Sequence, residues 1–453
     1  MARALLRAPV EVCMWLLNLL SALTVATPGG PPPALSLDEA VAMALARSPT
    51  LAGARASSEA HAARVEAAET AWLPRLTLEA RYRYLGPVPE LTLDTGLTLP
   101  GQSEPLVMRR ALGSEHNAEV ALSAAWRALD FGVRAARIDA ARGLARAAER
   151  EADARVVEVA YATRVAYLGL LLADEGARTT DAALALARAT RDDLARRKDA
   201  GLASPLGLAG AELRVAELEA RAADAAEGVA RARDALATLI GQPASARDTL
   251  EGALVDQPAA LGAEHPSLTR LRATEGAFAA QALAARRAPL TTLDVFARAG
   301  VQSPATLVDP DELGVAWLAG VSLTWDLFDG GLRAAEAREA DARASEARRG
   351  REALSEELER ARAEAEARRA SAEVQLATAE RRLRAAETYL VAARGALDAG
   401  TGRATDLQAA EVGLDEARLA RARALHQRAL AEAQRRRALG LSVDLAAPKE
   451  ITP

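Results

Sequence analysis

The stretch Trp325-Asp326-Leu327-Phe328-Asp329-Gly330-Gly331-Leu332-Arg333 is where the sequence changes from an alternating apolar and polar pattern to a long run rich in Ala, Arg and Glu. The first pattern is typical of a strand and the second of a helix. An earlier copy at residues 126–134 has Trp, Asp, Gly and Arg at matching places, 199 residues upstream. The same offset relates Gly201 to Gly400 and Gly241 to Gly440. The sequence therefore predicts one structural unit that is present twice in tandem.

The composition narrows the function classes. The chain has 453 residues, a net charge of −5, 3% aromatic residues and one cysteine, Cys13. Charges of both signs are mixed along the helical runs, which is typical of solvated helix faces rather than of a nucleic-acid-binding patch. The four histidines lack metal-ligand spacing, and no nucleophile–base set or phosphate-binding loop stands out. We therefore predict no enzyme, no cofactor, no metal site and no nucleic-acid partner.

The N-terminus has the pattern of an export signal. Arg3 and Arg7 precede a mostly apolar run at residues 12–25, which ends in small residues. A basic start, a short apolar run and small residues are typical of a secretory signal peptide, which we place at residues 1–26. No later segment approaches the roughly 20 consecutive apolar residues of a transmembrane helix. Residues 27–35, rich in Pro and Gly, are then expected to form an extended tether.

The first repeat is assigned to residues 36–241. Ser36 and Glu39 form a capping box at the start of the first helices. Strands are expected at residues 76–85 and 120–126, with a small hairpin near residues 91–99 in the loop between them. Residues 133–199 contain no proline and predict one long helix, and a return helix from residue 205 ends at residue 241.

The second repeat is assigned to residues 265–441, after a linker or equatorial region at residues 242–264 and before a C-terminal tail at residues 442–453. Its strands are expected at residues 291–301 and 315–326. A long helix at residues 332–398 and a return helix at 403–439 follow. Leucines recur every seven residues near the end of the long helix, at 376, 383, 390 and 397. A sustained seven-residue repeat predicts a left-handed supercoil with a neighbouring helix.

The strands and helices together suggest an architecture. Strands of about ten residues with one apolar face have the length that crosses an outer membrane when tilted. Four strands cannot close a barrel, and an open edge in lipid leaves backbone groups unpaired. Three chains would supply twelve strands, an even number found in bacterial barrels. A soluble sheet with one wet face shows the same alternation, so a soluble periplasmic coiled-coil adaptor or scaffold is the alternative prediction.

Several motifs, in their order and duplication, resemble the TolC family of outer-membrane efflux proteins. They are Leu-Asp-Glu-Ala at residues 37–40, Trp-Leu-Pro-Arg-Leu at 72–76, Phe-Asp-Gly-Gly at 328–331, and the Ala-Gly helix turns at 200–201 and 399–400. The resemblance implies an α+β membrane protein: a trimeric twelve-stranded β-barrel, four strands per chain, continued by an α-helical coiled-coil barrel. It implies an exit duct of a tripartite efflux or type I secretion system in the outer membrane of a Gram-negative bacterium. The implied partners are two further chains, outer-membrane lipid, a periplasmic adaptor at the tips Gly201 and Gly400, and an inner-membrane transporter reached through that adaptor.

The same resemblance singles out candidate gate residues. In the family, aspartates shortly after the second tip narrow the entrance, and Asp406 matches the first of them, whereas Ala409 occupies the second position. Thr401, Arg403 and Thr405 are candidates to hold the closed tip. The competing interpretation is that Asp406 lies near a helix N-terminus, where negative charge is favourable.

The strand-to-helix turns are a third group of candidates. Asp130 and Gly132 lie between the expected strand at residues 120–126 and the long helix from residue 133, and the glycine pair Gly330-Gly331 follows Asp329. Asp130-Phe131-Gly132 matches a kinase triplet in letters only, and we interpret it as one of these turns.

Overall fold

A computed structural model describes residues 33–95, 107–111, 114–201, 203–252, 264–288, 291–303 and 313–441. The expected signal peptide, most of the tether and the C-terminal tail lie outside the described residues. The chain divides into two compact units. The sheet unit comprises Leu45–Ala162, Asp256–Ala377 and Gln427–Pro453, and the tip unit comprises Met1–Ala44, Thr163–Val255 and Thr378–His426. Each unit is described by itself.

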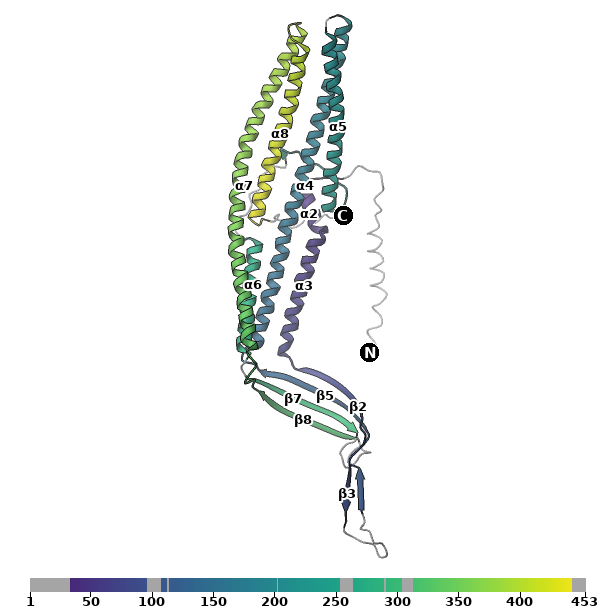
Figure 1. Cartoon of the computed structure of the whole chain (residues 1–453), viewed down its shortest axis with the longest axis vertical. Coiled ribbons are helices and arrows are strands. Elements are labelled where there is room, and N and C mark those ends of the chain that lie inside the picture. The colour runs from purple at the N-terminus through teal and green to yellow at the C-terminus, as the bar shows by residue number, and fades with distance from the viewer. Residues whose placement is uncertain are drawn as a thin grey trace, which may run out of the picture. The chain divides into compact units, whose positions relative to one another are not determined.

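The sheet unit contains the four predicted strands in one antiparallel sheet. They are β2 (Arg75–Tyr84), β5 (His116–Leu129), β7 (Thr292–Ser303) and β8 (Gly314–Thr324), in the order β2-β5-β7-β8 (Figure 1). Ladders of eleven paired residues join β5 to β7 and β7 to β8. The two central strands, β5 and β7, therefore come from different repeats. Each repeat supplies only two of the four strands, so the sheet requires both.

The hairpin in the first loop is present but wider than expected. Its strands are β3 (Glu90–Asp94) and β4 (Val107–Ala111), with Asp94 paired to Val107. The prediction that both strands fall near residues 91–99 was therefore wrong. Leu91 and Leu93 alternate in only a short run, which does not fix the partner strand, and the actual partner, Val107–Ala111, shows no alternation that would reveal it.

Two helices that are shorter than those of the hairpins precede strands β2 and β7. Helix α3 (Pro49–Glu69) begins at the N-cap Ser48, whose hydroxyl accepts from the Leu51 amide, and a 3₁₀ turn, η1 (Thr70–Trp72), follows it. Helix α6 (Pro266–Arg287) begins after the N-cap His265. Both helices have proline in their first turn, where a missing N–H costs no hydrogen bond.

The bounds of the long helices agree with the predicted ones to within one residue. They are α4 (Val133–Asp199), α5 (Pro205–Ile240), α7 (Leu332–Asp398) and α8 (Ala404–Ala438). Helix α5 begins at the N-cap Ser204 and ends at Gly241 in the left-handed conformation. In the tip unit, Leu390 and Leu397 of the predicted heptads pack against buried Ala393, Leu407 and Ala410, which confirms the pairing of α7 with α8.

The tip unit also contains the first helix and a small sheet. The predicted capping box opens α2 (Leu37–Arg47): the Glu39 amide donates to Ser36 Oγ at 3.3 Å, and the Ser36 amide donates to Glu39 Oε2 at 2.8 Å. Strand β1 (Ala34–Leu35) pairs in parallel with β6 (Ser245–Ala246). The end of the tether and the start of the linker are thus joined.

One described helix, α4, contains a window long and apolar enough to cross a membrane by length and composition. Somewhat under half of that window, 44%, is buried in this chain. A packed core helix passes the same test, and the apolar part of α4 is packed in this chain: Tyr167, Leu170 and Leu171 are at most 3% exposed.

Candidate functional site

The sheet has one apolar and one charged face. Leu76, Leu78, Val120, Leu122 and Trp317 are all exposed on the apolar side, with exposed fractions of 44–78%. The strand register puts them on one side, since Leu78 is opposite Leu122 and Ala299 is opposite Trp317. An exposed apolar face that extends across neighbouring strands of a sheet requires lipid or another chain to cover it.

The two strand-to-helix turns share one hydrogen-bond pattern. In the first, Asp130 Oδ1 accepts from the Gly132 amide at 3.2 Å, and Asp130 Oδ2 accepts from the Arg134 amide at 2.9 Å. In the second, Asp329 accepts from the Gly331 and Arg333 amides at 2.9 and 3.1 Å. These backbone hydrogen bonds lower the pKa of Asp329. Each aspartate therefore caps the first turn of a long helix.

The turns differ in what surrounds them. Arg134 is buried; it donates to the carbonyls of Ala71 and Arg127 at 2.9 and 2.8 Å and lies 3.8 Å from the centre of the Trp72 ring. Arg333 pairs with Asp326 instead, and the neighbouring Phe328 is 90% exposed. The first turn is thus packed within its own chain, whereas the second presents an apolar surface outward.

Each of the two helical hairpins in the tip unit has a glycine at its tip. Gly201 and Gly400 have φ values of 72° and 71°, in the left-handed region that favours glycine. Arg197 of α4 joins the two hairpins, because it donates to Asp398 Oδ1 at 2.5 Å and to the Leu397 carbonyl at 3.1 Å. The carboxylates of Asp193 and Asp398 both accept hydrogen bonds from Arg197, and these bonds raise the pKa of Arg197.

The four candidate gate residues lie together at the start of α8, and all four are exposed. The Arg403 amide donates to Asp406 Oδ2 at 3.3 Å, and the Asp406 amide donates to the Arg403 carbonyl at 3.1 Å. Thr401 Oγ1 donates to the Ala396 carbonyl at 3.2 Å. Asp406 thus has the geometry of a helix-capping carboxylate, and Thr405 lies beside it.

Sequence reasoning missed a buried cluster of charged and polar groups in the tip unit. Arg214 of α5 donates to Asp415 of α8 at 2.7 Å, and Thr190 of α4 donates to Glu411 of α8 at 2.5 Å. All four residues are buried, each with less than 10% of its surface exposed. Burial raises the pKa of both carboxyl groups, and it outweighs the nearby Arg214, which lowers both. The available signal was the match of Glu212 to Glu411 at the repeat offset.

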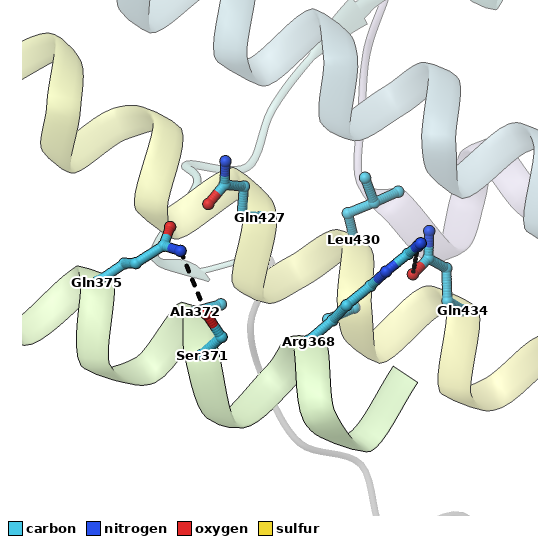
Figure 2. Close-up of a pocket in the computed structure, with 8 residues that line it drawn as sticks. Arg368, Ser371, Ala372, Gln375, Gln427, Leu430 and Gln434 are labelled. Carbon is cyan, nitrogen blue, oxygen red and sulfur yellow. Dashed lines mark hydrogen bonds between the residues drawn. The ribbon is translucent and has the colours of Figure 1, made fainter. Parts of the chain in front are cut away.

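A polar groove lies between α7 and α8 in the sheet unit (Figure 2). Its cavity measures about 180 Å³. Within it, Arg368 donates to Gln434 at 3.0 Å and Gln375 donates to Ser371 at 3.2 Å. These four groups are paired with one another, and the lining contains no histidine or carboxylate that could act as a general base toward Ser371. Among the described residues, no group of three or more His, Cys, Asp and Glu could hold a metal ion.

The architecture defines a class of protein: an outer-membrane channel whose chains each supply four strands and two long helical hairpins. Residues 40–242 and 258–441 match the family model of the outer membrane efflux proteins. Because the two matches cover most of the sequence, the chain belongs to this family. Its members are channels of tripartite efflux systems that form trimeric barrels in the outer membrane of Gram-negative bacteria. The alternative of a soluble periplasmic adaptor is therefore wrong.

Solved structures show the same fold. The outer membrane protein VceC from Vibrio cholerae is 22% identical with a TM-score of 0.72, over 90% of this chain and 96% of VceC. The CmeC outer membrane channel from Campylobacter jejuni is 17% identical with a TM-score of 0.71, over 93% and 91% of the two chains. The open-state MtrE outer membrane channel from Neisseria gonorrhoeae is 21% identical with a TM-score of 0.70, over 90% and 89%. No curated relative matches the chain.

Proposed function

We propose that three copies of this chain form a passive exit duct whose hairpin tips bind a periplasmic adaptor, through which an inner-membrane transporter delivers the cargo. The observation that carries the adaptor site is an exposed apolar stripe beside the first tip. Leu206 and Leu213 of α5 are 80% and 63% exposed. Seven residues apart, they lie on one helix face, which is the spacing at which a coiled-coil partner inserts its own side chains.

A photocrosslinking experiment tests the adaptor site. A photoreactive amino acid at position 206 in intact cells is expected to crosslink to a membrane-anchored periplasmic protein, identified by mass spectrometry. The matched control is position 374, because Val374 is 68% exposed on α7 in the other unit. A crosslink from position 206 only to another copy of this chain would assign the stripe to the trimer interface and contradict the proposal.

We place the gate at Asp406. Three chains bring three copies of this exposed carboxylate to one end of the duct, where they form a ring that attracts cations and whose mutual repulsion protonation or a bound cation relieves. The support is its exposed position in the first turn of α8, six residues after the tip Gly400, with Thr401, Arg403 and Thr405 near it in the sequence. Ala409 offers no second ring.

Two substitutions separate gating from helix capping. Asp406→Asn removes the charge but keeps an oxygen that can accept from the Arg403 amide, whereas Asp406→Ala removes both. If Asp406 forms the constriction, both variants raise single-channel conductance in planar bilayers. If it only caps α8, Asn leaves the conductance unchanged and Ala lowers the stability of the tip. The second result would reject the gate.

A further inference from the structure

The charged face of the sheet has an excess of positive charge. Its side chains alternate with the apolar ones, so both sets are fixed by the same register. Along the four strands this face carries five arginines and three carboxylates: Arg75, Arg81, Arg83, Arg127, Arg298, Glu79, Glu119 and Asp294. A barrel in lipid turns its apolar face outward and its polar face toward the lumen. The barrel wall of this channel therefore carries two unbalanced positive charges per chain.

Three of the arginines form ion pairs with all three carboxylates, and no other cation of the described residues approaches these carboxylates within ion-pair distance. Arg298 pairs with Glu119 at 2.6 Å and approaches Glu79 at 3.8 Å. Arg81 approaches the same Glu79 oxygen at 3.5 Å. On the other side of Arg298, Arg127 pairs with Asp294 at 3.0 Å. These residues form charge-neutral sets across three neighbouring strands.

The remaining two arginines of this face are Arg75 and Arg83. Both are exposed, and neither has a carboxylate within ion-pair distance among the described residues. Arg75 is opposite Ala125 and Arg83 is opposite Asn117, so the neighbouring strand supplies no charge at either position. They lie eight residues apart at the two ends of β2, or about 26 Å along the strand. Each would contribute one arginine per chain to a ring at its own level of the barrel.

We propose that Arg75 and Arg83 make the barrel lumen a binding path for multivalent anions, so that the outer part of the duct favours anionic cargo. Walls of low dielectric constant concentrate the field of like charges in a narrow lumen and raise the local concentration of counter-ions. Rings of arginine are a general device for anion passage. The inference depends only on the sheet and on trimer formation, and not on the proposed adaptor or gate sites.

Block of single-channel current tests the inference. The purified trimer enters a planar bilayer by its sheet end, since that is the part with a lipid-facing surface, and the helices remain in the chamber of addition. The opposite chamber then faces the barrel mouth. Tripolyphosphate added there is expected to reduce the current. In the double variant R75Q/R83Q the half-blocking concentration is expected to rise about ten-fold, equivalent to about 1.4 kcal/mol.

Matched variants separate charge from structure. R75K/R83K keeps both charges and is expected to retain the block. R127Q/D294N removes one charge of each sign from the same face and is expected to leave the half-blocking concentration within about two-fold, since the net charge of the lumen does not change. Trimer yield on native gels confirms that each variant assembles.

Three results would overturn the proposal. The first is absence of block from the barrel side, and the second is equal block in R75Q/R83Q and the unmodified channel. The third is stronger block by hexamminecobalt(III) than by tripolyphosphate from that chamber. That result would show that carboxylates, rather than Arg75 and Arg83, dominate the field on the barrel side.

Discussion

Arg214 Nη2 on α5 donates to Asp415 Oδ2 on α8 at 2.7 Å, and the two side chains are only 10% and 11% exposed. One turn earlier on α8, Glu411 accepts from Thr190 of α4. Asp415 Oδ1 has no hydrogen-bond partner within the described part of the chain. Buried charges are tolerated only when paired, so this cluster makes the contact of α8 with α4 and α5 depend on specific partners rather than on general apolar packing.

Arg214→Leu is expected to destabilise the tip unit by about 3–5 kcal/mol, because it removes the one cation that is paired with the buried Asp415 at hydrogen-bond distance. The double variant R214L/D415L is expected to recover most of that loss, since no charge remains buried at the pair. Guanidinium unfolding of the detergent-solubilised protein, followed by protease cleavage within the helical hairpins, measures both.

Arg188→Leu is the control for that pair. Arg188 of α4 pairs with Glu219 of α5 at 2.7 Å, but both side chains are 51% exposed. An exposed pair contributes less than about 1 kcal/mol. Equal losses for R214L and R188L would mean that burial of the Arg214 pair has no energetic consequence.

The pKa shifts of Glu411 and Asp415 predict a pH dependence. Burial raises both folded-state pKa values, while Arg394 and Arg214 favour the charge on Glu411, and Arg214, Arg418 and Arg221 favour the charge on Asp415. The folded state therefore binds more protons than the unfolded state at pH values above about 4, where unfolded carboxyl groups titrate. The sign of the linkage then makes the free energy of unfolding fall as pH rises through this window.

Melting temperatures recorded from about pH 4.5 to 7.5 measure that slope. Glu411→Gln is expected to flatten it, because glutamine keeps an acceptor for Thr190 and has no proton to lose. Glu219→Gln, on the exposed side of the same hairpins, serves as the control. A slope that survives in E411Q unchanged would assign the pH dependence to other groups.

Replacing Gly330 and Gly331 with valine is expected to prevent trimer assembly. Their φ values are 65° and 88°, and a side chain costs about 1–2 kcal/mol per residue in the left-handed region. The β-branched side chain adds to that cost, so the strand end cannot turn into α7. Blue-native gels of the membrane fraction measure the trimer yield.

Gly350→Ala is the matched control for the turn. Gly350 lies within α7 with nothing within 4 Å of an added Cβ, and alanine is favoured over glycine inside a helix. Its trimer yield should equal that of the unmodified chain. A normal yield for the valine variant would mean that the glycine turn is not needed for assembly.

Much of the fold could be predicted because local periodicity decides it. The exact bounds of α4 and α7 followed from the absence of proline between the turns at Gly132 and Gly201, and between those at Gly331 and Gly400. The strand faces followed from alternation. These features depend on residues that are close together in the sequence, so a single sequence is enough to predict them.

Features that depend on distant partners could not be predicted. Asp94 pairs with Val107 across a loop, and short alternating runs do not specify such a partner. The pair of Arg214 with Asp415 joins positions 201 residues apart. In an Arg- and Glu-rich helix, nothing local distinguishes these two side chains from the many exposed ones. The excess charge of the lumen likewise emerged only when the register showed which arginines lack partners.

Tyr167→Phe tests how the small sheet is fixed to α4 in the tip unit. The Tyr167 side chain is fully buried, and its hydroxyl lies 2.8 Å from the Leu35 carbonyl and 3.0 Å from Asp248 Oδ2. The Asp248 carboxylate also accepts from the Leu37 amide at 2.8 Å. One phenol therefore joins β1, the start of α2 and the segment after β6. Burial raises the pKa of Tyr167, so the hydroxyl keeps its proton at any physiological pH.

Phenylalanine keeps the ring and removes these hydrogen bonds, leaving a buried carbonyl and carboxylate with fewer partners, at a cost of about 1–3 kcal/mol. Amide hydrogen exchange is expected to accelerate at Ser245 and Arg247, whose amides donate to the carbonyls of Pro33 and Leu35. Tyr161→Phe on the same helix, whose ring packs against Arg437, is the control. Unchanged exchange in Y167F would show that β1 and β6 are held by their own ladder, and that the tyrosine only fills space.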